Sequence, residues 1–223
     1  MDKIPFSVYD TLAILSCGMV VLAAGDYIVG SDIVLRKDGI PANITILLIF
    51  AAYILGQIIA NIALTVYEGM LVRRFLRPPA VRLMADASTL SPMRWVFPGY
   101  FQPLPPETQA HIRTQAAARN CTAAGEGLFL HCYAIATANI DKLQARLDEF
   151  RNQYGFSRNV SCALFLAGFG ILAGHHLHPE RVHLRWAIAA FLAAIGLLYR
   201  YLRFFRQYSY ELLLRYSELA AAK

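Results

Sequence analysis

Long apolar stretches alternate with polar segments along the chain, and four of them dominate its pattern. They cover residues 12–29, 44–66, 160–174 and 186–202. A helix needs ~20 apolar residues to cross the ~30 Å hydrocarbon core of a bilayer, and each stretch is near that length. We therefore expect an all-α integral membrane protein with four transmembrane helices, at about residues 11–29, 44–66, 159–175 and 184–203.

The second stretch carries polar side chains on one side of an otherwise apolar helix. At ~100° per residue, Tyr53, Gln57, Asn61 and Glu68 fall within a roughly 80° sector, and we call these four residues the polar stripe. Polar groups in hydrocarbon need partners, so the stripe is expected to face other helices or water inside a bundle. One interpretation is hydrogen bonding between helices, with Asp26 of the first stretch as a water-reached interfacial group. The other is a hydrated path that includes Asp26 as a cation or proton contact.

The pore interpretation requires assembly. Four helices of this length enclose little free volume, so a conducting path would need several copies of the chain. The polar stripe is accordingly expected to be a helix-packing or subunit-facing surface.

The polar segment between the second and third stretches predicts a small helical domain. Its first part, residues 80–106, mixes prolines with aromatic residues and is expected to form an extended strap. Helix signals return at residues 106–119 and again from Glu126 to Tyr154, which we expect to be one long amphipathic helix. In that helix Leu143, Leu147, Phe150 and Tyr154 follow a 4-3-4 spacing, the seam of a coiled coil.

The fourth stretch meets no proline before the C-terminus, so its helix is expected to continue far beyond the bilayer. This C-terminal extension and the seam helix can pack together, either within one subunit or between subunits. The expected domains are an N-terminal transmembrane hairpin at 1–79, the strap and helical domain at 80–155, and a C-terminal hairpin with its extension at 156–223. Long extensions of the third and fourth spans thus build a small cytoplasmic helical domain.

Composition and charge support a membrane protein and give it an orientation. The chain has 223 residues, of which 57% are hydrophobic and 16% charged, too apolar for an ordinary soluble domain. Arg36, Lys37, Arg181 and Arg185 are the cations of the first and third loops, and the other 17 of 21 lie on the opposite side. The positive-inside rule therefore places both termini and the central segment in the cytoplasm.

The positive charge is concentrated where the spans reach that side. Membrane-surface contacts are expected there from a set of six arginines: Arg73, Arg74, Arg77, Arg200, Arg203 and Arg206. The expected partners are the lipid bilayer, further copies of the chain and a possible cytoplasmic protein, and no specific nucleic acid.

The sequence contains no motif that indicates catalysis. There is no nucleotide-binding loop, no Gly-x-Ser-x-Gly and no His-Glu-x-x-His, so we expect no enzyme activity and no cofactor. Four histidines in the third loop, at positions 175, 176, 178 and 183, could gather around a metal ion or respond to acid pH. Hydrated loop histidines without a metal are the favoured interpretation.

Three short motifs carry a resemblance to known proteins. They are Ser7-Val8-Tyr9-Asp10, Tyr53-Ile54-Leu55-Gly56-Gln57, and Tyr154-Gly155-Phe156-Ser157-Arg158-Asn159 with the four residues before it. The chain resembles a loose group of uncharacterised bacterial four-span inner-membrane proteins, some of which are candidate membrane effectors beside anti-phage defence modules. The resemblance implies a multi-pass protein of the bacterial inner membrane and brings no catalytic residue with it.

Three functions are compatible with these observations. The leading hypothesis is a homo-oligomeric effector that permeabilises or depolarises the inner membrane when its cytoplasmic domain is triggered. The alternative is a non-conducting anchor or scaffold that recruits a cytoplasmic partner. A small transporter is the third, weakened because the sequence has no internal repeat and no pair of broken spans.

Overall fold

The computed structural model describes residues 8–31, 33–35, 39–85 and 92–219, and every regular element among these residues is helical. Four helices are long and apolar enough to cross a membrane: Thr11–Val29, Ala42–Leu83, Leu143–Leu177 and Leu184–Leu219. The expectation of four long apolar helices is therefore confirmed. Ser7 of the first motif, the loop cations Arg36 and Lys37, and strap residues 86–91 lie outside the described residues.

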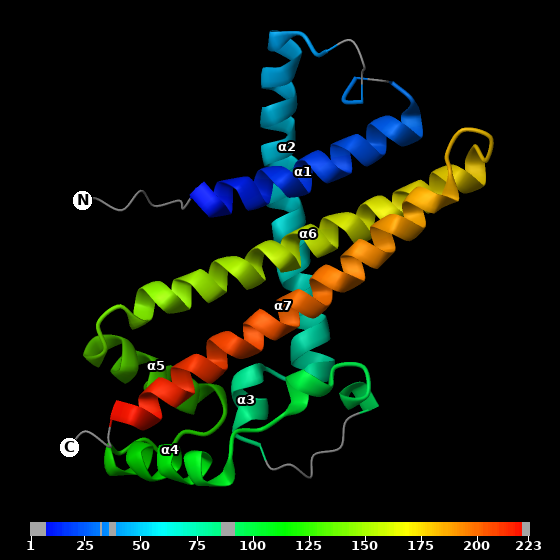
Figure 1. Ribbon diagram of the computed structural model, residues 1–223. Helices are drawn as coiled ribbons and strands as arrows, with labels where there is room; N and C mark the ends of the chain where they lie inside the picture. Colours follow the sequence, from blue (N-terminus) through cyan, green and yellow to red (C-terminus); the bar gives the residue numbers. More distant parts are fainter. Residues whose placement is uncertain (1–7, 32, 36–38, 86–91, 220–223) are drawn as a thin grey trace. The chain divides into compact units, whose positions relative to one another are not determined.

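The elements follow one another along the chain as labelled in Figure 1. In order they are α1 (Val8–Val29), α2 (Ala42–Ala63), the π-helix η1 (Leu64–Leu76), α3 (Pro79–Leu83), the 3₁₀ turns η2 (Pro92–Arg94) and η3 (Pro98–Phe101), α4 (Pro106–Ala118), α5 (Glu126–Asn139), α6 (Leu143–Leu177) and α7 (Leu184–Leu219). Contacts divide the chain into unit 1 (Met1–Glu68 and Gly155–Tyr201) and unit 2 (Gly69–Tyr154 and Leu202–Lys223).

In unit 1, α1 and α2 cross each other (Figure 1), and a glycine of each helix lies at the crossing. The backbone of Gly18 lies against the backbone of Ala52, and Gly56 lies against the backbone of Ile14 in the same way. Ile14 and Gly18 are four residues apart in α1, as are Ala52 and Gly56 in α2, so the contacts lie on one face of each helix. Each of these faces contributes a glycine to the crossing. Such faces let backbones approach closely in membranes. The buried side of α2 accordingly consists of Ala52, Gly56, Ile59 and Ala63.

The rest of unit 1 is built from α6, α7 and the end of α1. Ala24, Ala167, Ile171, Val182 and Ala187 form its buried apolar cluster. Interleaved rings extend this packing along the two long helices, because Phe191 lies 6.1 Å from Phe165 and 5.0 Å from Phe169 between ring centroids.

The loop between α6 and α7 is fastened to α1 by hydrogen bonds. The backbone N–H of His183 donates to the Tyr27 hydroxyl at 2.9 Å, and the Arg181 guanidinium donates to the Ile28 carbonyl at 3.1 Å. The first and third loops of the sequence therefore meet at one end of unit 1.

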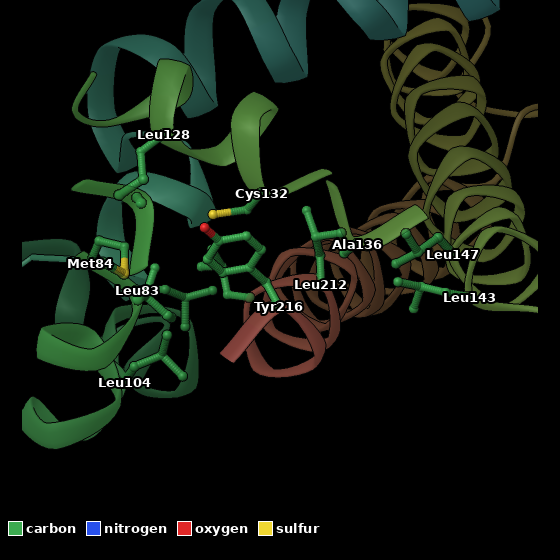
Figure 2. Close-up of a cluster of buried hydrophobic side chains, with 13 residues drawn as sticks. Leu83, Met84, Leu104, Leu128, Cys132, Ala136, Leu143, Leu147, Leu212 and Tyr216 are labelled. Carbon is green, nitrogen blue, oxygen red and sulfur yellow. The ribbon is translucent and has the colours of Figure 1, made fainter. Parts of the chain in front are cut away.

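Unit 2 has a hydrophobic core of its own, centred on Tyr216. Figure 2 shows this ring with Leu83, Cys132 and Leu212 around it. Leu143 and Leu147 of the seam are 3% and 1% exposed in the same cluster.

The rest of the seam lies against aromatic rings of α7. Phe150 is 6.4 Å from Phe204, and Tyr154 is 5.0 Å from Phe205. The structure thus brings the seam against the C-terminal part of α7 within one chain. Unit 2 consequently needs residues after 202 as well as those of the central segment.

Two expectations about the central segment are wrong. The helix expected from Glu126 to Tyr154 is broken, since α5 ends at Asn139 and α6 begins at Leu143. Ile140 is extended and Lys142 has a φ of 65°, so the chain turns and both Ala136 and Leu143 can enter the core. Gly155, in contrast, continues α6 without a break.

The strap is the second correction. Its described residues form the short turns α3, η2 and η3 where an extended chain was expected. Proline occupies the first turn of α3 and of η3, where its fixed φ favours a helical start. Tyr100 and Phe101 are buried by this arrangement, whereas Trp95 is 91% exposed.

Candidate functional site

The polar stripe lies beside the buried face of α2 instead of within it. Tyr53 and Asn61 are exposed and Gln57 is half-buried, while the small residues next to them face α1. The Gln57 amide donates to the Tyr53 hydroxyl at 3.0 Å, a hydrogen bond within the helix. The expectation that these side chains face other helices is therefore not met within one chain for these three residues.

Glu68, the fourth member of the stripe, pairs with Arg158 of α6. The Arg158 side chain is 11% exposed and that of Glu68 is 31% exposed. Arg158 also donates through Nε to the Asn159 side chain at 3.0 Å. A largely buried guanidinium with two partners satisfies the general rule that buried charges are paired.

A second polar contact lies one residue before Glu68. The buried hydroxyls of Tyr67 and Ser161 are 2.9 Å apart, and Ser161 donates to the Ala194 carbonyl of α7 at 2.7 Å. The Tyr67 ring also stacks on Tyr201, with 5.9 Å between centroids. We call Tyr67, Glu68, Arg158, Ser161 and the Ala194 carbonyl the polar latch, because together they join η1, α6 and α7 within unit 1.

The latch coincides with the start of an unusual helix. π-helical geometry is rare and occurs mainly as single turns near functional sites, yet η1 runs over 13 residues. At its start the Thr65 hydroxyl donates to the Asn61 carbonyl at 3.0 Å, a local bond that competes with regular helical pairing. Backbone geometry therefore changes where the chain enters the latch.

Sequence reasoning identified Glu68 but missed its partners. Arg158 and Ser161 were attributed to a motif and to an apolar stretch, and Tyr67 falls outside the polar stripe. The available signal was the group of polar residues Ser157, Arg158, Asn159 and Ser161 where the third apolar stretch begins, three of which are buried.

Asp26 is the anchor of the first loop. Its carboxylate accepts hydrogen bonds from the Ser31 hydroxyl and from the backbone N–H groups of Ile33 (2.9 Å), Val34 (3.1 Å) and Leu35 (3.0 Å). Its exposure is 7%. The Asp26 carboxylate oxygens thus accept hydrogen bonds from the first loop at the end of α1, apart from the polar stripe.

The arginines expected at the membrane surface differ in their surroundings. Arg73, Arg74, Arg77, Arg200 and Arg203 are exposed. Arg206 is half-buried, donates to the Gln102 carbonyl at 2.9 Å and lies 5.6 Å from the Tyr210 ring centroid. Arg206 therefore helps to hold η3 against α7 within unit 2, in addition to any contact with headgroups.

Two of the four histidines expected in the third loop, His175 and His176, lie in the last turn of α6. His175 Nδ1 lies 2.6 Å from the Val182 carbonyl, and His178 lies 3.8 Å from Glu180. Within the described ranges, no three His, Cys, Asp or Glu side chains gather as metal ligands.

All four cysteines are free thiols. Burial raises the pKa of the Cys132 thiol to about 12, so this sulfur stays protonated at neutral pH. It belongs to the core of unit 2 and is a poor nucleophile.

Comparison with known protein families, with curated proteins and with solved structures finds no match to this chain.

Proposed function

We propose that this protein is a homo-oligomeric effector of the bacterial inner membrane, with both termini cytoplasmic, that permeabilises or depolarises the membrane when triggered. The observation that carries the proposal is that Tyr53 and Asn61 are exposed, and Gln57 half-buried, on a helix that is apolar enough to span a bilayer. A lone chain would turn these groups toward lipid. Association of several copies would supply partners or water for them.

The geometry of α2 favours assembly through the stripe. The small-residue face of α2 is occupied by α1. The adjacent stripe remains available to another copy, and its side chains can hydrogen-bond across such an interface. A ring of chains with the stripes turned inward would line a path with tyrosine, amide and carboxyl groups.

The polar latch and the core of unit 2 support a triggered mechanism. Glu68 is the stripe residue that is held by α6, through its pair with Arg158. Release of that pair would free a carboxylate seven residues after Asn61 on the same candidate membrane span. Unit 2 would receive the trigger, and the protein would act without catalysis. The chain also resembles a loose group of uncharacterised inner-membrane proteins, and the candidate effectors of anti-phage defence among them would be expected to act in this way.

The test replaces the amides by leucine. The double variant Gln57→Leu/Asn61→Leu removes two stripe groups and keeps an apolar helix of similar size. Expression of the unaltered chain is expected to collapse the membrane potential, measured with a potential-sensitive dye, and the double variant is expected to abolish the collapse. The matched control is Ile58→Leu/Ile62→Leu, which introduces the same side chain at exposed positions of α2 outside the stripe.

Two outcomes would overturn the proposal. One is depolarisation by the double variant equal to that of the unaltered chain. The other is a monomer in mild detergent and in vesicles, because a single chain offers no room for a conducting path.

A second candidate is a membrane scaffold that recruits a cytoplasmic protein. The observation that favours it is the exposure of Trp95 at 91% and Val96 at 51% on unit 2, an apolar pair that the described residues of this chain leave uncovered. Under this function, Trp95→Ser in the full chain abolishes partner capture, and the protein never causes ion flux. Loss of depolarisation in the leucine double variant would decide against it.

A further inference from the structure

A cavity of about 630 Å³ lies within unit 1 between α1, α6 and α7. Twelve side chains line it, and six of them are alanines, including Ala24, Ala167 and Ala190. Alanine leaves the space that larger side chains would fill, so three facing helices with alanines at their contacts enclose a groove. Its volume falls in the ~300–1,000 Å³ range of small-molecule pockets.

The lining selects a hydrocarbon ligand. None of these twelve described residues carries a charge, and Tyr27 and Trp186 are the two with a polar atom in the side chain. An apolar cavity of this kind does not hold water stably. All three helices that line it are candidate membrane spans, so in a bilayer lipid acyl chains would reach the groove.

One end of the groove has the chemistry of a headgroup site. Trp186 and Tyr27 lie near the helix ends, the level at which aromatic residues occur in membrane proteins. Arg185 is exposed, and its guanidinium carbon lies 5.7 Å from the Trp186 ring centroid, so a positive charge stands beside a residue that lines the groove. From Trp186 to Ala193 the groove follows α7 for about 10 Å toward the interior of the bilayer.

We propose that this groove binds one acyl chain of an anionic phospholipid, with the lipid phosphate at Arg185. A neutral lipid would fill the groove equally well but would gain nothing from the arginine. A helix of a second copy is a poorer occupant, because a helix ~10–12 Å across needs more room over ~10 Å of length than the roughly 630 Å³ present. The proposal requires only that the protein spans a membrane, and it is independent of any conducting role.

The test uses Trp186 as its own reporter. The chain has two tryptophans, so Trp95→Phe leaves Trp186 as the single fluorophore. The full-length variant is reconstituted in phosphatidylcholine vesicles that contain a minor fraction of phosphatidylglycerol. Bromine, which quenches tryptophan on contact, is placed on the acyl chains of one lipid at a time.

Brominated phosphatidylglycerol is expected to associate with Trp186 about fivefold more strongly than brominated phosphatidylcholine at the same fraction, the preference that one cation near a headgroup supplies. Arg185→Gln lowers this ratio to about one. Ala190→Leu fills the groove and reduces quenching by both lipids, whereas Ala173→Leu, an exposed position of α6 outside the groove, changes neither.

Three results would overturn the proposal. Equal quenching by the two lipids in the variant that keeps Arg185 means that Trp186 contacts bulk lipid only. Unchanged quenching in Ala190→Leu means that the acyl chain lies outside the groove. Absence of quenching by either lipid means that protein, such as a second copy, covers the groove.

Discussion

Gly56→Ala tests the crossing of α1 and α2 most directly. A Cβ atom at this position would lie 2.7 Å from the carbonyl carbon of Ile14 and 2.8 Å from the Cγ2 atom of the same residue. The carbonyl oxygen of Ile14 would be nearer still. Ordinary contact begins at 3.4 Å, so the Ile14 carbonyl oxygen, the nearest atom, would have to move away by roughly 1.4 Å. The obstacle is backbone and cannot rotate away.

The energy follows from two opposing effects. Overpacking costs about 1–3 kcal/mol, and alanine recovers up to about 1 kcal/mol through its better helix propensity. Because backbone blocks the new methyl group, we expect a net loss of about 2 kcal/mol in the free energy of unfolding. Gly18→Ala meets Ala52 at the same crossing, so the double variant is expected to cost much less than the sum of the two.

The assay is equilibrium unfolding in mixed micelles, followed by far-ultraviolet circular dichroism. Gly196→Ala is the matched control, since a Cβ there meets nothing within 4 Å. That variant is expected to be more stable than the unaltered chain by about 0.5–1 kcal/mol, from helix propensity alone. If Gly56→Ala is as stable as Gly196→Ala, the close approach of the two helices is refuted.

Three further predictions concern buried groups. Glu68→Gln leaves the Arg158 side chain charged and 11% exposed without its partner. This variant should lower the free energy of unfolding by about 2 kcal/mol, less than the loss of a partner in a fully buried pair. Simple additivity in a double-mutant cycle with Arg158→Met would contradict the pairing. Asp26→Ala removes the acceptor of three backbone N–H groups, so hydrogen exchange should quicken in the loop after α1 but not within α1, and unchanged protection would argue against the anchor. Burial raises the pKa of the Cys132 thiol to about 12 from its ordinary 9.0, so maleimide should label this thiol only after unfolding. The free energy of unfolding should fall as the pH rises above 9.0, because the unfolded chain then loses the thiol proton more readily than the folded chain.

The apolar helices could be predicted from sequence because bilayer crossing depends on length and composition alone. The break between α5 and α6 could not be predicted from the sequence. Residues 140–142 contain neither glycine nor proline. Lys142 has a φ of 65°, and the turn lets both neighbouring helices contribute to one buried cluster. Such a tertiary requirement leaves no local trace. The end of η1 at Leu76 has a local cause, because Pro78 disfavours a helical conformation at Arg77.

The candidate site also has features that the sequence predicts and features that it does not. Helical periodicity placed Gln57 and Asn61 on one face correctly, but it could not say which face of α2 meets α1. The small residues decide this, because glycine at position 56 lets backbone meet backbone and so outcompetes polar contacts. The partner of Glu68 lies 90 residues further along the chain, beyond the reach of any local pattern.

The exposed stripe has a consequence for how much protein a cell can hold before it responds. Each interhelical hydrogen bond contributes about 0.6–2 kcal/mol in a membrane, so Tyr53, Gln57 and Asn61 can supply only a weak association. Under the proposed function, assembly then obeys mass action, and the number of copies per area of membrane sets the fraction assembled. A cell could carry the protein harmlessly at low copy number, and surface density would set how many copies assemble once the trigger reaches unit 2.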